Sequence, residues 1–402
     1  MSKVLVFTAS FGEGHNQAAF AVSEALQNAG ATVKIVDYVE WLNPAFRSFA
    51  KFSLLQGIQK APSLYGLFYN SMSRIQPDSS FQRRLNHLGL TRLMRLLRSF
   101  QPDVVVSTFP TPSGVMSELR TNGWTSTPNV GIITDYTLHG QWVQEHTDAY
   151  FVATDSVKKQ LLSHGVESSQ IYISGIPIRS IFTNRSNANL AAQRVRAREE
   201  HGFEADVPLI ILMGGGAGVL GDVNEWERLM RKTNAQFAVI CGRNERLYKR
   251  MQSIEDHRIR ILGYVSDVDE WMAMADLIIT KAGGITVSEC MAMELPMLLY
   301  RPIPGQETQN AKYAVDAGFA VQAKTFKVAK ELIAQLISKP DTLEAMRANA
   351  HKVKRPNATT EIAETILHIA EQPRNKIVPT NKNLTMKTRS REKSIRPIIT
   401  RP

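Results

Sequence analysis

The residues best suited to chemistry lie around a glycine turn, TKAGGITVSE, between an apolar run and a helix pattern. Gly283 and Gly284 allow backbone to approach a ligand, and the helix start offers unpaired N–H groups to a diphosphate. Glu289 can accept ribose hydroxyls, or merely complement the helix dipole. Gln306 and Glu307, in the loop PGQE, can bind sugar hydroxyls or lie in a solvated turn. Together these side chains suit a nucleotide-sugar.

A candidate proton acceptor, His15, stands in the glycine-rich turn FGEGH after the first apolar run. A neutral imidazole there can take a proton from an attacking hydroxyl, although His15 can equally cap the helix or pack. Asp135, in ITDYTLHGQW, follows another apolar run and is a candidate to orient His15 or the acceptor. His139 and Trp142 in the same segment are candidate acceptor-site residues, with a plain surface position as the alternative for His139.

Short apolar runs alternate with helix patterns along the whole chain, which predicts doubly wound parallel sheets. In the first half the expected strands are residues 4–7, 33–36, 104–107, 130–134 and 150–153. The pattern restarts, with expected strands at residues 209–213, 237–241, 259–262, 277–280 and 297–300. Ligand loops of such sheets lie at the carboxyl ends of the strands, so two domains that face each other enclose a cleft.

The domain boundaries follow from this alternation and from the linker SGIPIR. We expect two Rossmann-like domains, a closing helix and a basic tail that composition marks as disordered, over residues 1–176, 177–357, 358–372 and 373–402. A glycine run follows the first strand of the second half. Its members Gly215 and Gly216 are candidates for a diphosphate cradle, or form an ordinary turn. No Walker lysine follows this run, so it is not a P-loop of an NTP-hydrolysing enzyme.

The formal charge of +11 is concentrated in two places. Residues 46–100 contain nine Lys and Arg against one Asp, and residues 374–402 contain nine against one Glu. Arg92, Arg95 and Arg98 alternate with leucines at helical spacing, which is typical of a helix on an anionic membrane surface. The alternative is a core-packed helix with a solvated basic face. No motif that reads DNA or RNA is present, so nucleic acid is not an expected partner.

The compartment is indicated by the cysteines and the hydropathy pattern. The two cysteines, Cys241 and Cys290, form neither a disulfide framework nor a zinc-site spacing, which favours a reducing cytoplasm. The N-terminus is an expected strand rather than a signal segment. No run of about 18 apolar residues occurs, so any membrane contact is expected to be peripheral, on the cytoplasmic face.

Nine segments, in order, carry a resemblance to a known family: FGEGHNQAA, STFP, ITDYTLHGQW, YFVATDSVKKQLL, SGIPIR, CGRN, LGYVSDVDEW, TKAGGITVSE and RPIPGQETQNA. Over residues 3–370 the chain resembles the processive diacylglycerol β-glucosyltransferases of Gram-positive bacteria, of glycosyltransferase family 28. These are relatives of plant monogalactosyldiacylglycerol synthases. The chain is more distantly similar to the lipid-linked N-acetylglucosaminyltransferase of peptidoglycan synthesis. The resemblance implies a GT-B fold, a UDP-sugar donor and inverting transfer without a metal or other cofactor.

The same resemblance assigns roles to residues. It implies that His15 is the base, that Glu289 holds ribose, and that the backbone around Tyr264 holds uracil. The leaving diphosphate is then expected to be stabilised by helix-end N–H groups with Arg243 or Lys281. The full set of expected donor-binding residues is Gly14, Gly215, Gly216, Arg243, Gly263, Tyr264, Val265, Lys281, Gly283, Gly284, Thr286, Glu289, Gln306 and Glu307.

The expected activity is glucosyl transfer from UDP-glucose to diacylglycerol and then to the added glucose. Such products serve as membrane glycolipids and as the anchor of lipoteichoic acid. Galactosyl transfer from UDP-galactose stays open, because the two hexoses differ in the orientation of one hydroxyl. N-acetylglucosaminyl transfer to a lipid-linked peptidoglycan precursor is a further alternative, and a nucleotide-sugar sensor without catalysis is a distant one.

Overall fold

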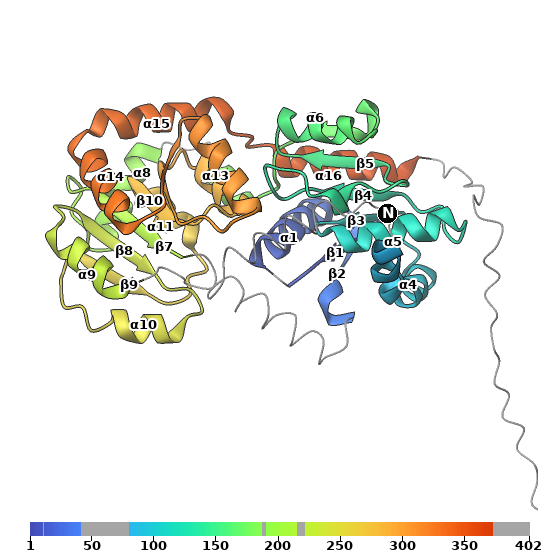
Figure 1. Ribbon diagram of the computed structural model, residues 1–402, viewed down its shortest axis with the longest axis horizontal. Coiled ribbons are helices and arrows are strands. Elements are labelled where there is room, and N and C mark those ends of the chain that lie inside the picture. The colour runs from blue at the N-terminus through green and yellow to red at the C-terminus, as the bar shows by residue number, and fades with distance from the viewer. Residues whose placement is uncertain (11, 42–79, 187–189, 215–221, 373–402) are drawn as a thin grey trace, which may run out of the picture.

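The computed structural model describes residues 1–10, 12–41, 80–186, 190–214 and 222–372. These residues form two α/β lobes side by side (Figure 1), each built on a six-stranded sheet. Every strand pairing in both sheets is parallel. The predicted class, two doubly wound α/β domains, is therefore confirmed.

The first sheet has the strand order β2-β1-β3-β4-β5-β6. Its strands are β1 (Lys3–Thr8), β2 (Thr32–Asp37), β3 (Val104–Ser107), β4 (Asn129–Ile132), β5 (Ala149–Val152) and β6 (Ile171–Ile173). The central strands β3, β4 and β5 are buried along their whole length. Continuous apolar runs are what a parallel sheet covered on both faces requires.

The second sheet has the order β12-β11-β10-β7-β8-β9. Its strands are β7 (Leu209–Met213), β8 (Gln236–Ile240), β9 (Ile259–Leu262), β10 (Leu277–Thr280), β11 (Met297–Tyr300) and β12 (Ala320–Ala323). Four of the five strands predicted for this half, β7, β9, β10 and β11, have the predicted bounds. The strands missing from the prediction, β6 and β12, are edge strands with mixed burial, so neither contains a continuous apolar run.

Helices join the strands and cover both sheets (Figure 1). In the first lobe they are α1 (Glu13–Asn28), α4 (Ser80–Phe100), α5 (Pro110–Thr121) and α6 (Asp155–Ser163), with the 3₁₀ turns η1 (Tyr38–Trp41), η2 (Gly140–Trp142) and η3 (Ser168–Gln170). In the second they are α7 (Ser180–Ser186), α8 (Leu190–Glu200), α9 (Val223–Lys232), α10 (Glu245–Met251), α11 (Val268–Met274), α12 (Gly284–Ala292), α13 (Gln306–Asp316), α14 (Phe326–Ser338) and α15 (Pro340–Val353). The expected helix at 16–28 begins earlier, so His15 lies in the first turn of α1.

The last described helix, α16 (Ala358–Glu371), returns to the first lobe and packs beside α1 (Figure 1). Ile362 and Ile366 are fully buried in the core cluster that also holds Val22 and Leu26 of α1. The two chain crossings between the lobes contact each other, because Thr359 Oγ1 accepts from Ile178 N at 3.1 Å and donates to its carbonyl at 2.8 Å. The predicted boundaries at 176 and 357 stay predictions.

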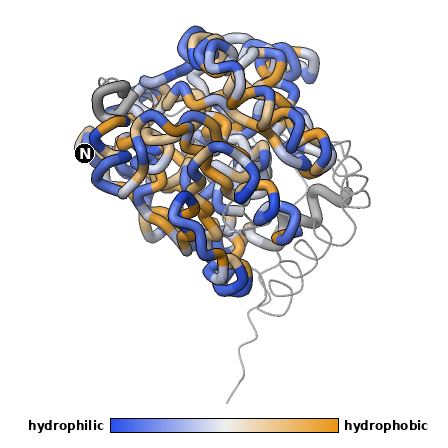
Figure 2. The backbone as a smooth tube through the Cα atoms, turned by 90° about the vertical axis from the view of Figure 1, so that its left-hand side faces the viewer, coloured by the Kyte–Doolittle hydropathy of each residue, from blue (hydrophilic) through white to orange (hydrophobic). Residues whose placement is uncertain are grey.

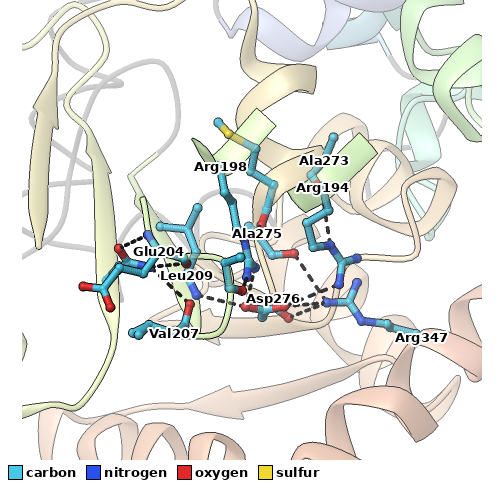
Figure 3. Close-up of polar contacts among 12 residues, drawn as sticks. Arg194, Arg198, Glu204, Val207, Leu209, Ala273, Ala275, Asp276 and Arg347 are labelled. Carbon is cyan, nitrogen blue, oxygen red and sulfur yellow. Dashed lines mark hydrogen bonds and ion pairs between the residues drawn. The ribbon is translucent and has the colours of Figure 1, made fainter. Parts of the chain in front are cut away.

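A charge cluster around Asp276 ties together the second lobe (Figure 3). Arg194 and Arg198 of α8 and Arg347 of α15 point at this carboxylate, with N···O distances of 3.4, 2.6 and 3.3 Å. Leu209 N, at the start of β7, donates to Asp276 Oδ2 at 2.9 Å. The cluster therefore joins two helices to the amino-terminal ends of the central strands β7 and β10.

Helix α4 packs its apolar face on the protein rather than leaving it free. Leu93 is fully buried in a cluster with Phe7 and Leu119, and Leu96 and Leu97 pack against that cluster. Arg92, Arg95 and Arg98 lie on the exposed face. The alternative of a core-packed helix with a solvated basic face therefore describes this helix. The other charges of the two basic regions, apart from the arginines on α4, fall on residues 46–88 and 374–402, whose side chains lie outside the description.

The hydropathy of the described chain is distributed in short stretches, hydrophobic and hydrophilic by turns (Figure 2). None of the helices in the described ranges combines the length and the apolar character that crossing a bilayer demands.

Candidate functional site

A cleft of about 420 Å³ separates the two lobes. It is lined by residues that follow β1 and β4 of the first sheet and β7 to β11 of the second. The predicted site residues on its wall are Gly14, His15, Asp135, Arg243, Tyr264, Val265, Lys281, Gly283, Gly284, Thr286, Glu289, Gln306 and Glu307. The topology thus brings the expected donor and acceptor halves to one place, as parallel strands predict.

His15 faces the cleft from the first turn of α1. Its Nδ1 lies 2.7 Å from the carbonyl oxygen of Thr108 and 3.2 Å from Thr134 Oγ1. A carbonyl only accepts, so Nδ1 carries the proton and Nε2 is the acceptor nitrogen. Burial lowers the pKa of His15, an effect opposed by the charge of Asp135 and by the Thr108 hydrogen bond. The ring is therefore neutral at pH 7 and can accept a proton through Nε2.

Asp135 follows β4 and acts on His15 through charge. Its Oδ1 accepts a hydrogen bond of 2.9 Å from Asn310 Nδ2, which belongs to α13 of the other lobe. Burial raises the pKa of Asp135, while the Asn310 hydrogen bond and His15 oppose that rise. The groups that hold the His15 ring are thus Thr108 and Thr134, and Asp135 contributes an electrostatic partner.

Glu289 is a buried carboxyl group on α12, only 7 % exposed. Burial raises its pKa to about 8, with Arg179 lowering it and Asp269 raising it further. Among the described residues no hydrogen bond reaches this carboxylate. Such an unsatisfied acceptor on a cleft wall is free to receive hydroxyl donors from a ligand.

Lys281, in the loop after β10, and Glu307, in the first turn of α13, form an oppositely charged pair. Burial lowers the pKa of Lys281 and raises that of Glu307, and each charge opposes the shift of the other. Glu307 Oε2 also accepts from Ile303 N at 2.8 Å. Gly305, with φ at 109°, supplies the left-handed backbone that turns this loop into α13. Gln306 lines the cleft in the first turn of that helix.

The glycine turn at α12 serves the contact between the lobes as well as the cleft. A Cβ at Gly284 would lie 2.1 Å from the carbonyl oxygen of Thr134 in the other lobe. A Cβ at Gly283 would meet no atom closer than Thr286 Oγ1 at 3.9 Å. Close approach to a ligand was the expected reason for both glycines. For Gly284 the structure supplies another reason, which is the passage of the first lobe's backbone.

An ion pair joins the two lobes at the wall of the cleft beside Tyr264. Arg243 Nη1 lies 2.5 Å from Glu13 Oε1 in the other lobe. The same guanidinium stands over the Tyr264 ring, 5.0 Å from its centroid. Arg243 therefore lies between the two lobes and beside the segment expected to hold a base.

The remaining predicted residues lie elsewhere. Gly263 is not among the cleft residues in the described chain, and its carbonyl accepts from Gly242 N at 3.1 Å. Gly215 and Gly216 fall outside the described residues, although the preceding Gly214 lines the cleft. Trp142 is 4 % exposed in a core cluster with Tyr150, so it supports the first lobe.

His139 caps η2, where its Nδ1 accepts from Gln141 N at 3.4 Å. Burial lowers the pKa of His139 to about 4. Neither His139 nor Trp142 stands on the described wall of the cleft, so their assignment to the acceptor stays a prediction.

The sequence did not predict the contacts that four residues make at or beside the cleft. These residues are Glu13, Thr108, Arg179 and Asn310. Each lies in a segment already noted (FGEGH, STFP, SGIPIR, GQETQN), but its partner is distant in sequence. Thr108, for example, meets His15 across 93 positions. As for metals, the described residues contain no group of three or more His, Cys, Asp or Glu side chains placed to hold an ion.

Comparison with known proteins gives matches along nearly the whole chain. Residues 15–178 match the family model of monogalactosyldiacylglycerol (MGDG) synthase, and residues 223–353 match that of glycosyl transferases group 1. The chain is 32 % identical over 378 residues to a processive diacylglycerol beta-glucosyltransferase of Bacillus licheniformis, covering 93 % of this chain and 96 % of that protein. The protein of the same name from Bacillus subtilis is also 32 % identical, with 92 % and 96 % covered.

Solved structures with the same arrangement of lobes include MurG of Acinetobacter baumannii, at a TM-score of 0.61 and 18 % identity, with 92 % of this chain and 100 % of that one covered. LpCGTa in complex with UDP has a TM-score of 0.57 at 13 % identity, with the same coverage. These similarities show the fold, and the predicted GT-B architecture is confirmed.

Proposed function

Because this chain belongs to the family of processive diacylglycerol β-glucosyltransferases, we propose that it transfers glucose from UDP-glucose to diacylglycerol and then to the glucosylated lipid. The observation that carries the proposal is the cleft, which His15 lines from one lobe and the unsatisfied carboxyl of Glu289 lines from the other. The relatives, which are named glucosyltransferases, favour glucose as the transferred sugar. The cleft adds a neutral base and a hydroxyl-binding wall in one enclosure.

In the proposed reaction the lipid hydroxyl attacks the anomeric carbon of glucose in a single displacement. The oxygen–carbon bond forms as the bond from that carbon to the diphosphate oxygen breaks, so configuration inverts and UDP leaves. His15 Nε2 takes the hydroxyl proton, and the nearby Asp135 carboxylate stabilises the imidazolium. The second transfer repeats these steps with a hydroxyl of the bound glucose.

On the donor side, Glu289 accepts ribose hydroxyls, and Gln306 with Glu307 receives those of the hexose. The N-terminus of α12 and Lys281 stand where the leaving diphosphate needs positive charge. We propose that these protein groups stabilise it without a metal ion.

We propose that the enzyme acts on the cytoplasmic face of the membrane, held there by charge. Arg92, Arg95 and Arg98 share the solvent-facing side of α4, and a basic surface of this kind is attracted to anionic lipid. Since the apolar face of α4 is packed in the core, this attraction is electrostatic rather than insertional.

The deciding experiment is a donor panel. Purified full-length protein is incubated with diacylglycerol vesicles and UDP-glucose, UDP-galactose or UDP-N-acetylglucosamine, and the lipids are identified by mass spectrometry. We expect mono- and diglucosyl lipids, formed equally well with and without EDTA. Galactolipid in place of glucolipid would change the assigned donor to UDP-galactose. Nucleotide binding without any lipid product would indicate a nucleotide-sugar sensor without catalysis.

A further inference from the structure

The loop after β4 inserts its side chains into the second lobe. Tyr136 is 6 % exposed, and its ring stacks on that of Tyr313 in α13, with 4.1 Å between centroids and 15° between planes. Its hydroxyl lies 2.8 Å from Ser288 Oγ, which in turn donates to the Gly284 carbonyl at 2.9 Å. This loop therefore forms part of a close-packed joint between the lobes.

Asn310 is the polar centre of that joint and is fully buried. Its Nδ2 donates to Asp135 Oδ1 at 2.9 Å and to the carbonyl of Ala282 at 3.0 Å. Its Oδ1 accepts from Tyr136 N at 2.8 Å. The backbone partners settle which end of the amide is which, because Tyr136 N–H can only donate and the Ala282 carbonyl can only accept. Asn310 must therefore present a donor to Asp135.

This donor has a chemical consequence for Asp135. A hydrogen bond donated to a carboxylate favours its charged form. The titratable groups that face Asp135 are His15 of α1, Tyr136 of its own loop and Glu307 of α13. Burial opposes the ionisation of Asp135, and so does the like charge of Glu307, whereas the Asn310 hydrogen bond favours the charged form.

The position of Asn310 along α13 links two halves of the site. Gln306 and Glu307 form the first turn of this helix, and residues four apart on a helix share one face. The helix that carries the hexose-binding side chains thus also supplies the donor to Asp135, which belongs to the other lobe.

We infer that Asn310 is a positioning residue: its hydrogen bond stabilises the charged form of Asp135, the electrostatic partner of His15, so that the base is fully supported only when α13 is docked against the first lobe. The kinetic part of this inference rests on the proposed function. The structural part, which is the hydrogen bond from Asn310 to Asp135 and the charge interaction of Asp135 with His15, does not.

The test follows the titration of the His15 ring by NMR in full-length protein labelled at histidine, without substrate. Asn310→Ala removes the donor, so the pKa of His15 falls, as it does in Asp135→Asn. Adding Asn310→Ala to Asp135→Asn produces no further change, because the two act through one group. Tyr136→Phe removes a hydrogen bond from the same joint but leaves Asn310 in place, so this control titrates as the parent does.

An unchanged His15 titration in Asn310→Ala overturns the inference, as does an equal shift in Tyr136→Phe. Thermal melts verify folding. Should Asn310→Ala not fold, Asn310→Ser is measured instead, because its shorter hydroxyl does not reach Asp135. In the transfer assay, Asn310→Ala lowers kcat by about tenfold or more while the KM for UDP-glucose stays within about threefold. A change confined to KM would contradict the role. Because the titration needs no substrate, its result stands even where the donor panel fails.

Discussion

Two acidic side chains of the second lobe, Asp276 and Glu289, have opposite surroundings, one in a charge cluster and the other in the cleft. Asp276 is met by three arginines and a backbone N–H, all within one lobe (Figure 3). Glu289 is more deeply buried yet receives no hydrogen bond from the described residues. The first arrangement satisfies its charge and so supports the fold. The second leaves a carboxyl whose ionisation is unfavourable until a ligand supplies donors, which is the sign of a binding site.

Burying several guanidinium groups around one carboxylate is unfavourable for the charged form of the arginines. Burial and the neighbouring Arg194 lower the pKa of Arg347 to about 10, in spite of Asp276. The Arg347 guanidinium nevertheless stays charged at pH 7. The contrast teaches that substitutions in the Asp276 cluster should change stability, and that substitutions in the cleft should change function.

The largest effect is expected in the cleft at His15. His15→Ala removes the only base proposed for the reaction, so kcat falls by about a thousandfold, within the usual range for general-base catalysis. Calorimetry should show unchanged UDP affinity. The control is His164→Ala, which removes an exposed histidine just after α6 and should leave kcat unchanged. Near-normal turnover of His15→Ala would remove His15 from the base role.

The next effect is expected at the other cluster. Asp276→Asn leaves three buried arginines without their shared anion, so the free energy of unfolding in urea should fall by about 3 kcal/mol. Asp316→Asn is the control, because it breaks an exposed pair with Lys312 on α13 and should cost much less. If Asp276→Asn instead lowered kcat at unchanged stability, the contrast between the clusters would be wrong.

Glu289→Gln should raise the stability of the folded state at high pH, whereas Asp276→Asn should lower stability. The folded pKa of Glu289, about 8, stands above its ordinary 4.5, so the folded state favours the protonated form. The stability this gives is complete below pH 4.5 and is lost as pH rises toward about 8. The glutamine variant keeps a neutral side chain, so at pH 9 it should be more stable than the parent by a few kcal/mol, and nearly equal at pH 5.

The same variant should bind UDP-glucose about tenfold more weakly, because a carboxylate accepts hydroxyl donors better than an amide does. Thermal melts at the two pH values, together with calorimetry, check both statements. Equal melting temperatures of variant and parent at pH 9 would show that Glu289 is not strained by its burial.

The smallest effect per residue is expected at the exposed arginines of α4, which belong to neither cluster. Replacing Arg92, Arg95 and Arg98 by Gln should weaken flotation with anionic vesicles by about 1 kcal/mol per charge at low salt, and by less at high salt. Transfer to diacylglycerol in neutral detergent should not change. The matched control replaces three exposed arginines of the second lobe, Arg228, Arg246 and Arg250. Equal loss in both triple variants would show that net charge, rather than α4, decides binding.

The sequence predicts the fold well where a pattern is local. Continuous apolar runs such as 209–213 and 277–280 mark buried parallel strands directly, and the structure keeps those bounds. Edge strands such as β12 are only partly buried and carry no such run. Helix α4 shows the limit of periodicity, because an apolar stripe looks the same whether it meets lipid or the protein's own core.

The candidate site divides in the same manner. Glu289 and Gln306 lie in turns whose composition already suits a ligand. The contacts made by Thr108 and Asn310 depend on how distant strands and lobes meet, 93 and 175 positions apart. Gly284 is a mixed case: its residue type was expected, but the atom that requires it, the Thr134 carbonyl, belongs to the other lobe.

The return of α16 to the first lobe has a consequence for biosynthesis. Ile362 and Ile366 complete a core whose other members, such as Val4 and Leu26, leave the ribosome near the beginning of translation. At about 5–20 residues per second, the roughly 200 residues between β6 and the end of α16 take about 10–40 s to make. During that interval the nascent first lobe exposes the apolar groove beside α1. A messenger truncated before α16 would therefore yield a chain that chaperones and proteases recognise, however well its second lobe folds.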